Sequence, residues 1–503
     1  MTDDASGELE LVWRGKYDGD GNRVRVPPRS VALTPIERHG SPAEPHGELV
    51  WGDNLDALDA WLPQHRGGVD LVYIDPPFST GSDFPVLIRA RDQAGLVRAV
   101  AQPAYTDRWP GGAAAYLAML APRLERIHAL LTPHGSLYVH VDPTLGHAVR
   151  LLLDEVFGAA AFQREIIWRI GWVSGFKTRA RNWIRNHDTI LFYAKDPKRM
   201  RFNKVYVPHL EGYVRRSGAP AKAPGMAVDD VWNAGSGDLA LRGTDALDSI
   251  QIKSFSREKT GYATQKNESL LRRIIAASSN PGDLVVDAFS GAGTTAVVAA
   301  AMGRRFLACD VGAAAIQLTR ARLLGTVPHC AWTLATTRTI GMPDPAPSPA
   351  QVEKTGTRRW RISTRGRSDT ESLTSTFGHV ANAPSLVLEL DIGSDLHATI
   401  AVVDVDTASR APLGSEVRNA LSAGVDPVLE CAVDWAVSDD VLRPSEVRLA
   451  DAERAAARSF SSPGPLDANT RVAIAVVDLT FARVRVDLEI ERGRTWRVRA
   501  SSR

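Results

Sequence analysis

The sequence predicts an α/β fold in which a parallel sheet is covered by helices on both faces. Two stretches, 48–194 and 267–324, alternate short apolar segments with segments of helical periodicity. The chain of 503 residues is long enough for several domains of roughly 100–200 residues each. Its 44% hydrophobic and 23% charged residues are ordinary for a globular protein and exclude wholesale disorder.

The elements follow one another in an order that fits such a sheet. In the first stretch the pattern predicts strands at 48–52, 70–74, 136–141, 165–169 and 189–194, and helices at 54–62, 113–131 and 145–157. In the second stretch it predicts helices at 267–279, 294–302 and 313–324, with strands at 284–289 and 305–310 between them.

Changes in composition divide the chain into six parts. Residues 1–46 form an irregular N-terminal extension, and a Pro-rich linker at 331–359 contains the run 341–349. The α/β core comprises residues 47–195 and 259–330, and an inserted lobe at 196–258 separates its two halves. Strand-like runs at 386–392, 398–405 and 471–479 predict a mostly β accessory domain at 360–503.

A Gly-rich loop follows a buried strand at Asp287-Ala-Phe-Ser-Gly-Ala-Gly-Thr-Thr295. Glycines allow close backbone approach to a ligand, and the helix that follows offers free amides. The next strand ends in Asp310, where a carboxylate can accept ribose hydroxyls. The pattern favours a nucleoside-containing cofactor, and its short Gly-x-Gly suits S-adenosylmethionine rather than a dinucleotide. A tight strand-to-helix turn without a ligand is the alternative interpretation.

A second motif, Asp75-Pro-Pro-Phe78, ends an apolar strand. Two prolines fix an extended backbone and remove two amide donors, which leaves carbonyl oxygens rigidly placed. Asp75 and the Pro76 carbonyl can accept hydrogen bonds from an exocyclic amine, while Phe78 stacks on the base. The amine can then attack a sulfonium methyl directly. A Pro-rich turn without function is the alternative.

Charge is concentrated between Arg164 and Lys222, where fourteen Lys and Arg stand against four acids in a chain whose net charge is +2. Aromatic residues are interleaved with these cations, which is typical of a surface that tracks phosphates and stacks on bases. A solvated basic face is the alternative. Within this region we expect 171–185 to close over an extruded base. The candidate DNA-binding residues are Lys177, Arg179, Arg181, Arg185, Arg199, Arg201, Lys204, Arg215 and Arg216.

Several classes of protein are excluded. Cys309, Cys330 and Cys431 show no Cys-x-x-Cys spacing, and the histidines show no ligand spacing, so we expect no metal site and a reducing, cytoplasmic setting. No cysteine follows a proline, which argues against carbon-5 cytosine methylation. No apolar run approaches the ~20 residues of a membrane span.

The motifs in this order resemble the amino-directed DNA methyltransferases of the permuted, beta-class order, in which the catalytic motif precedes the cofactor loop. The resemblance covers about residues 47–325, and flanking matches at 11–18 and 434–437 are similar to adenine-specific members of the type III modification kind. Departures are Phe78 in place of Tyr, and Asn267 and Ala288 in place of Pro. The segments that carry the resemblance are 52–55, 73–81, 135–142, 186–195, 261–266 and 278–283.

The resemblance implies a Rossmann-like, S-adenosylmethionine-dependent methyltransferase sheet, with the inserted lobe reading the DNA sequence. The catalytic residues it implies are Asp75, Pro76, Pro77 and Phe78. The cofactor-binding residues it implies are Asp53, Thr264, Gln265, Lys266, Asp287, Phe289, Gly291, Gly293, Thr294 and Asp310.

We therefore predict a site-specific methyltransferase that modifies the N6 amine of adenine in duplex DNA by base flipping, in a restriction–modification or phage-defence setting. The alternatives are an N4-cytosine enzyme, a catalytically silent DNA-binding specificity subunit and an RNA substrate. The expected partners are duplex DNA, a separate restriction or defence subunit and a second copy of the chain, and no membrane.

Overall fold

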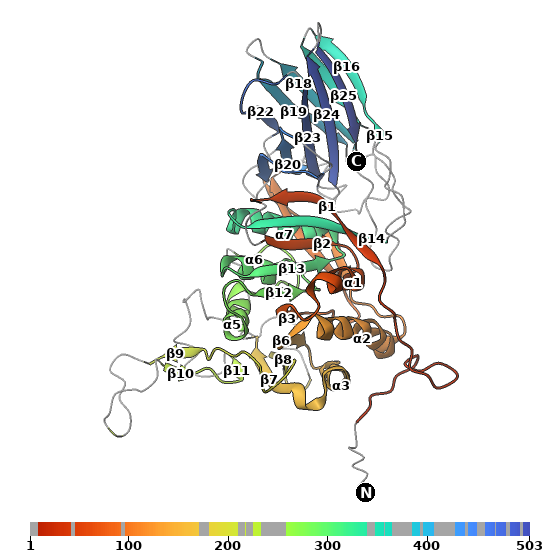
Figure 1. Cartoon of the computed structure of the whole chain (residues 1–503), viewed down its shortest axis with the longest axis vertical. Helices are drawn as coiled ribbons and strands as arrows, with labels where there is room; N and C mark the ends of the chain where they lie inside the picture. Colours follow the sequence, from red (N-terminus) through yellow and green to blue (C-terminus); the bar gives the residue numbers. More distant parts are fainter. Residues whose placement is uncertain are drawn as a thin grey trace.

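The structure is a computed structural model that extends along most of the chain. The described residues are 9–41, 46–91, 96–170, 181–209, 217, 225–232, 258–339, 348–356, 358–364, 385–392, 396–406, 428–437, 441–449, 458–467, 469–478, 483–492 and 496–502. They form a large α/β domain and a β domain next to it (Figure 1).

A ten-stranded mixed sheet forms the centre of the α/β domain. The strands from β14 to β6 run parallel to one another, whereas β1 and β8 lie antiparallel to their neighbours. The expectation of a wholly parallel sheet is therefore wrong at its two ends. The order is β1 (Val31–His39), β14 (Ala331–Thr339), β2 (His46–Trp51), β13 (Arg305–Asp310), β12 (Leu284–Asp287), β3 (Val69–Ile74), β6 (Leu131–Val141), β8 (His187–Ala194), β7 (Phe162–Arg169) and β11 (Val231–Trp232).

Helices cover both faces of this sheet, as the alternating pattern predicted (Figure 1). One apolar cluster packs α1 (Asn54–His65), α2 (Gly112–Leu130) and α3 (Gly146–Phe157) against the first face. A second cluster packs α5 (Glu268–Ser278), α6 (Thr294–Ala301) and α7 (Ala313–Thr326) against the other. The residues of β3 and β12 are buried on both sides, because central parallel strands face helices above and below.

The sheet begins earlier and ends later than the composition indicates. β1 lies inside the predicted irregular extension at 1–46, and β14 lies inside the predicted linker at 331–359. They pair antiparallel to each other, and β14 also pairs with β2. Both predicted boundaries are therefore wrong in part. The cause is that most side chains of β1 are only half-buried, so this edge strand has no apolar run.

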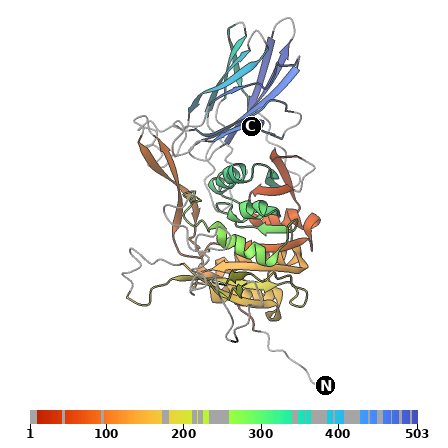
Figure 2. The same cartoon turned by 90° about the vertical axis from the view of Figure 1, so that its left-hand side faces the viewer.

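A long hairpin of β4 (Asp83–Arg91) and β5 (Val97–Thr106) follows the catalytic motif and was not predicted. It stands beside the sheet (Figure 2). The backbone amide of Leu87 donates to the carbonyl of Gly261 at 3.0 Å, and Val86 forms a bridge with Tyr262. This hairpin therefore joins the two sequence halves of the α/β domain.

Much of the predicted inserted lobe, 196–258, lies outside the described residues. Within it the structure describes β11 and the short pair of β9 (Tyr206–Pro208) and β10 (Gly225–Ala227). β11 extends the large sheet by pairing with β7.

The accessory domain is formed by two sheets that enclose one apolar core, which confirms the expected mostly β region. Core and surface side chains alternate along its strands, as in β18, where Leu386, Leu388 and Leu390 are buried. One sheet has the order β15 (Ser348–Pro349), β25 (Trp496–Ser502), β24 (Arg483–Arg492), β23 (Asn469–Asp478), β20 (Val428–Asp434) and β21 (Glu446–Leu449). The other has the order β16 (Gln351–Gly356), β17 (Arg359–Ser363), β18 (Ser385–Ile392), β19 (Ala398–Asp406) and β22 (Ser459–Ser461).

A buried ion triad joins the accessory domain to the α/β domain. The guanidinium of Arg320 on α7 is fully buried between Glu37 on β1 and Glu430 on β20. Its Nε donates to both carboxylate oxygens of Glu37 at 2.9 Å, and its Nη1 contacts Glu430. Close by, Leu442 exchanges backbone hydrogen bonds with Ile36 and Arg38. The two domains are therefore held together by charge and by backbone pairing.

We expect Glu430→Ala to lower the free energy of unfolding by about 3 kcal/mol, because it leaves part of a buried guanidinium charge uncompensated. Urea unfolding of the full chain measures the change. The control is Glu389→Ala, since Glu389 forms a surface pair with Arg361 that is worth at most about 1 kcal/mol. Equal losses in the two variants would contradict a structural role for the triad.

Candidate active site

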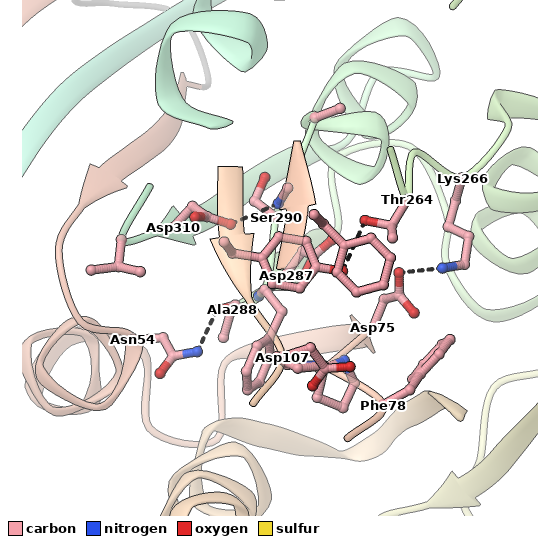
Figure 3. Close-up of a pocket in the computed structure, with 18 of the residues that line it drawn as sticks. Asn54, Asp75, Phe78, Asp107, Thr264, Lys266, Asp287, Ala288, Ser290 and Asp310 are labelled. Carbon is pink, nitrogen blue, oxygen red and sulfur yellow. Dashed lines mark hydrogen bonds and ion pairs between the residues drawn. The ribbon is translucent and has the colours of Figure 1, made fainter. Parts of the chain in front are cut away.

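The candidate site is a pocket at the edge of the sheet where the parallel strands end. Strand β12 pairs with β3 through Val285–Leu71 and Val286–Val72, and β13 lies on the other side of β12. Parallel neighbours end at the same edge, so three carboxylates that are far apart in sequence line one pocket: Asp75, Asp287 and Asp310 (Figure 3). The structure thus brings the two predicted motifs together.

Asp75 follows β3 directly and has its two carboxylate oxygens in different surroundings. Oδ2 is paired with the ammonium of Lys266, a contact drawn in Figure 3. Oδ1 is buried and has no hydrogen-bond partner among the described residues. An acceptor left open in a buried position is costly unless a ligand fills it. Asp75 therefore lines the pocket with one acceptor that has no partner among the described residues.

Phe78 lies next to this carboxylate, and its ring packs against the ring of His140. Its ring stacks on His140 with centroids 6.0 Å apart, and the Lys266 ammonium lies 5.2 Å from its centroid. His140 is held by the Tyr73 hydroxyl at 3.0 Å and lies 3.4 Å from Asp188. The Phe78 ring is therefore fixed as a platform for a flat ligand.

Asp107 is a functional residue that the sequence analysis missed. Its buried carboxylate accepts the backbone amides of Ser79 and Thr80, both at 2.8 Å, and the indole N–H of Trp109 at 3.0 Å. Ser79 has a φ of 60°, which is an unfavourable conformation for a residue other than glycine. Asp107 holds the turn after Phe78 in this shape. It follows β5, so only knowledge of the hairpin could have identified it.

Asp287 begins the Gly-rich loop and is completely buried. Burial, together with the negative charges of the neighbouring Asp75 and Asp310, raises the pKa of this carboxyl to about 7. The Thr295 hydroxyl at 2.5 Å and the Phe289 amide at 3.0 Å act in the opposite direction. Such a carboxyl is poised to ionise near neutral pH when a positive ligand binds.

Asp310 faces the same loop from the end of β13. It accepts the amides of Gly291 and Gly312, each at 2.8 Å, and burial raises the pKa of its carboxyl to about 6. The carboxylate therefore closes the loop against β13.

Gly293 is required by both its conformation and its packing. It has a φ of +74°, and a Cβ placed there would lie 2.4 Å from the side chain of Thr319. The Thr319 hydroxyl donates to the carbonyl of Gly291, and the Thr294 hydroxyl donates to the carbonyl of Lys266 at 3.0 Å. These contacts hold the loop open towards the pocket.

Two further predicted site residues, Asp53 and Gln265, form hydrogen bonds or ion pairs with neighbouring residues of the chain. Asp53 caps α1 by accepting the Leu55 amide at 2.8 Å, and its carboxylate pairs with Arg123 at 2.9 Å. The side-chain amide of Gln265 forms hydrogen bonds within its own loop: its oxygen accepts from the Thr260 amide, and its nitrogen donates to the Glu258 carbonyl. Both residues line the pocket, but their polar atoms are already engaged there.

Thr264 also lines the pocket, with its hydroxyl accepting from the Tyr105 hydroxyl at 3.2 Å. Tyr105 belongs to the β4–β5 hairpin and stacks on Tyr262, with centroids 6.2 Å apart. The hairpin therefore supplies one wall of the pocket.

The candidate DNA-binding residues that the structure describes lie at two different edges of the sheet. Arg181 and Arg185 precede β8, which begins at the pocket edge because it runs antiparallel to β6. Arg199 and Arg201 follow β8 and lie at the opposite edge, where Arg201 pairs with Asp283. Lys204 follows Arg201 in the chain, so the described cations of this region are divided between two edges of the sheet. Lys177, Arg179, Arg215 and Arg216 lie outside the described residues.

Two other features bear on the kind of site. In the described part of the chain, no group of three or more His, Cys, Asp or Glu side chains is placed to hold a metal ion. Among the helices the structure describes, none is long and apolar enough to cross a membrane.

Fold and pocket together define a class of enzyme that transfers a group from a nucleoside cofactor to an amine. The profile of one family, DNA methylase, matches residues 69–321, which is half of the chain. The chain belongs to this family. It is accordingly a DNA methyltransferase, and its cofactor is S-adenosylmethionine.

Curated relatives are similar to between 52% and 59% of the chain. The chain is 27% identical to type II methyltransferase M.EcaI of Enterobacter cloacae, over 52% of this chain and 66% of the relative. It is 28% identical to DNA adenine methyltransferase YhdJ of Escherichia coli K12, over 55% and 82% respectively. It is 23% identical to a probable type III restriction-modification Mod subunit of Haemophilus influenzae, over 59% of this chain and 51% of the relative.

We expect Gly293→Ala to weaken S-adenosylmethionine binding by at least about tenfold, because the new methyl group forces the loop away from Thr319. Calorimetric titration measures this. Gly303→Ala is the matched control, since Gly303 has a φ of +73° but its added Cβ would meet nothing closer than 3.9 Å. Both variants carry the same backbone strain. Unchanged affinity in Gly293→Ala would exclude this loop from the cofactor site.

Cofactor affinity should also depend on pH. The cofactor carries a positive sulfonium and a positive amino group, so it favours the ionised forms of Asp287 and Asp310, whose pKa values are raised to about 7 and about 6. We expect affinity to fall by about tenfold between pH 8 and pH 6, as Asp287 becomes protonated. Titrations across this range measure it. An affinity that is flat with pH would contradict the assignment.

Proposed function

We propose that the chain methylates the N6 amine of adenine at a specific site in duplex DNA, with the base turned out of the helix into the pocket. The observation that carries this proposal is the open, buried Oδ1 of Asp75 beside the fixed ring of Phe78. A base bound against Phe78 can place its amine on this oxygen. Because the pocket lies beyond the reach of a stacked base, the target must be extruded.

In this proposal the residues of the motif act on the amine directly. Asp75 Oδ1 and the Pro76 carbonyl accept its two hydrogens, which withdraws the nitrogen lone pair from conjugation with the ring and makes it available for attack. S-adenosylmethionine supplies the electrophilic methyl group. As the new bond forms at nitrogen, one amine proton passes along its hydrogen bond to Asp75. Phe78 stacks on the base and Pro77 keeps the motif extended.

Lys266 acts as a positioning residue for Asp75. Its ammonium holds Oδ2, which leaves Oδ1 turned to the pocket, and the pair is largely buried, with side-chain exposures of 11% and 17%. The positive charge also offsets the crowding of three carboxylates in one pocket. The same residue is joined to the Gly-rich loop through Thr294, so it links the two predicted motifs.

The proposed cofactor roles are those that the family resemblance implies. Asp287, Phe289, Gly291, Gly293 and Thr294 surround the methionine part, and Asp310 takes the ribose hydroxyls. The adenine part lies near Asp53, and the carboxylate lies on the side of Thr264, Gln265 and Lys266. Because the side-chain amide of Gln265 is hydrogen-bonded to Thr260 and Glu258, Gln265 stabilises the loop that forms this wall of the pocket.

Adenine is favoured over cytosine by Asp at position 75, where the resemblance associates Ser with N4-cytosine enzymes. One relative is named a DNA adenine methyltransferase. Methylation of N4 of cytosine is the second candidate, since the amine geometry is shared. A silent specificity subunit is disfavoured, because such a chain needs no complete cofactor pocket.

The proposed setting is restriction–modification or another phage defence, inside the cytoplasm where the DNA lies. A relative named as a type III Mod subunit supports a separate restriction or defence partner for this chain. A second copy of the chain is a further candidate partner.

Expression of the chain in a host without DNA methylation tests the function. We expect N6-methyladenine at one sequence motif in the wild type, and at least a thousandfold less in Asp75→Ala, measured by single-molecule sequencing and nucleoside mass spectrometry. Asp75→Ala should still bind cofactor, which separates lost chemistry from lost folding. N4-methylcytosine would establish the second candidate, and full activity in Asp75→Ala would refute the mechanism.

A further inference from the structure

Trp183 is exposed to a degree that packing cannot explain. Its side chain is 98% exposed, whereas the other tryptophans whose burial the structure describes are buried or half-buried. A large indole in full contact with water is unfavourable, so such a residue marks a surface that another molecule covers.

The segment of Trp183 lies at the pocket edge of the sheet. It leads into β8, and the end of β7 faces the start of β8 through the pairing of Arg169 with His187. The amide of Ile170 donates to the carbonyl of Asn186 at 3.0 Å. Because β8 is antiparallel to β6, and β6 is parallel to β3, this segment and Asp75 emerge on the same side.

A continuous set of contacts connects this segment to the base platform. Arg185 pairs with Asp188 and lies 3.5 Å from Asp142. Asp188 contacts His140, on which Phe78 stacks. One residue, Ile184, separates Arg185 from Trp183 along the chain. The indole is therefore carried on an anchored segment beside the mouth of the pocket.

Charge on the same segment indicates what covers the indole. Arg181 and Arg185 flank Trp183 and are exposed, so they can contact the phosphates on either side of one base step. An aromatic ring of this size matches a base in area and stacks without regard to sequence. A nucleic-acid duplex satisfies both features at once.

We propose that Trp183 enters the base stack of the duplex at the position that the target base leaves. This inference rests on the proposed base-flipping function. The indole stacks on the bases above and below the gap, which offsets the cost of unpairing and unstacking the target. Trp183 is thus a positioning residue for flipping that makes no contact with the reacting amine.

The test compares methylation of two duplexes by the full chain. One carries the normal target pair, and the other carries an abasic site opposite the target base, so that extrusion costs little. We expect Trp183→Ala to lower kcat/KM about 5- to 150-fold on the paired duplex, the range that loss of one stacking contact implies. On the abasic duplex the deficit should shrink to about threefold or less.

Two variants serve as controls. Trp183→Phe keeps a stacking ring and should retain most of the activity. Phe202→Ala removes another exposed aromatic ring, 47% exposed, from the opposite edge of the sheet and should have no effect. Cofactor affinity should be unchanged in every variant.

Two results would overturn the inference while the wild type still methylates DNA. One is normal activity of Trp183→Ala on the paired duplex. The other is an equal deficit on both duplexes, which would place Trp183 in general DNA binding or over the extruded base. Absence of methylation by the wild type would instead refute the proposed function itself.

Discussion

The pairing of β12 with β3 is the constraint on which the site depends. The two strands are more than two hundred residues apart, and each is buried on both faces. Their parallel register places Asp75 and Asp287 at one edge, where the chain turns away from the sheet. A slip of register would separate Asp75 and Phe78 from the Gly-rich loop. The apolar side chains of both strands, packed between two helical layers, hold this register.

The buried polar groups of the pocket are held in place by hydrogen bonds and ion pairs with neighbouring residues. Asp75 is held by Lys266, the turn after Phe78 by Asp107, and the Gly-rich loop by Asp310. Each of these contacts joins segments from different parts of the chain. Preorganised groups of this kind accelerate a reaction because they need no rearrangement when charge moves.

The central elements could be predicted from the sequence, because buried parallel strands are short apolar runs and their helices have clear periodicity. The family motifs also located Asp75, Asp287 and Asp310 in one pocket. The edge strand β1 could not be predicted, since its half-buried residues show no pattern. The place of Asp107 in the site could not be predicted either, because it depends on the pairing of β4 with β5, which the composition of these segments does not indicate. The position of Arg201 at the edge far from the pocket could not be predicted, because it depends on the antiparallel direction of β8.

The accessory domain is also joined to the α/β domain by a buried ionic contact, the Arg320 triad. Arg320 lies one residue after Thr319, which packs on the Gly-rich loop, and its charge is satisfied only when β1 and β20 are both in place. The docking of the accessory domain is therefore connected to the wall of the cofactor pocket through a single turn of α7.

The most direct measurement of the central claim is a structure of the full chain bound to its duplex with a non-reactive cofactor analogue. The account predicts an extruded adenine stacked on Phe78, with its N6 amine about 3 Å from Asp75 Oδ1. A target base that remains in the helix, or an amine held away from Asp75, would contradict it.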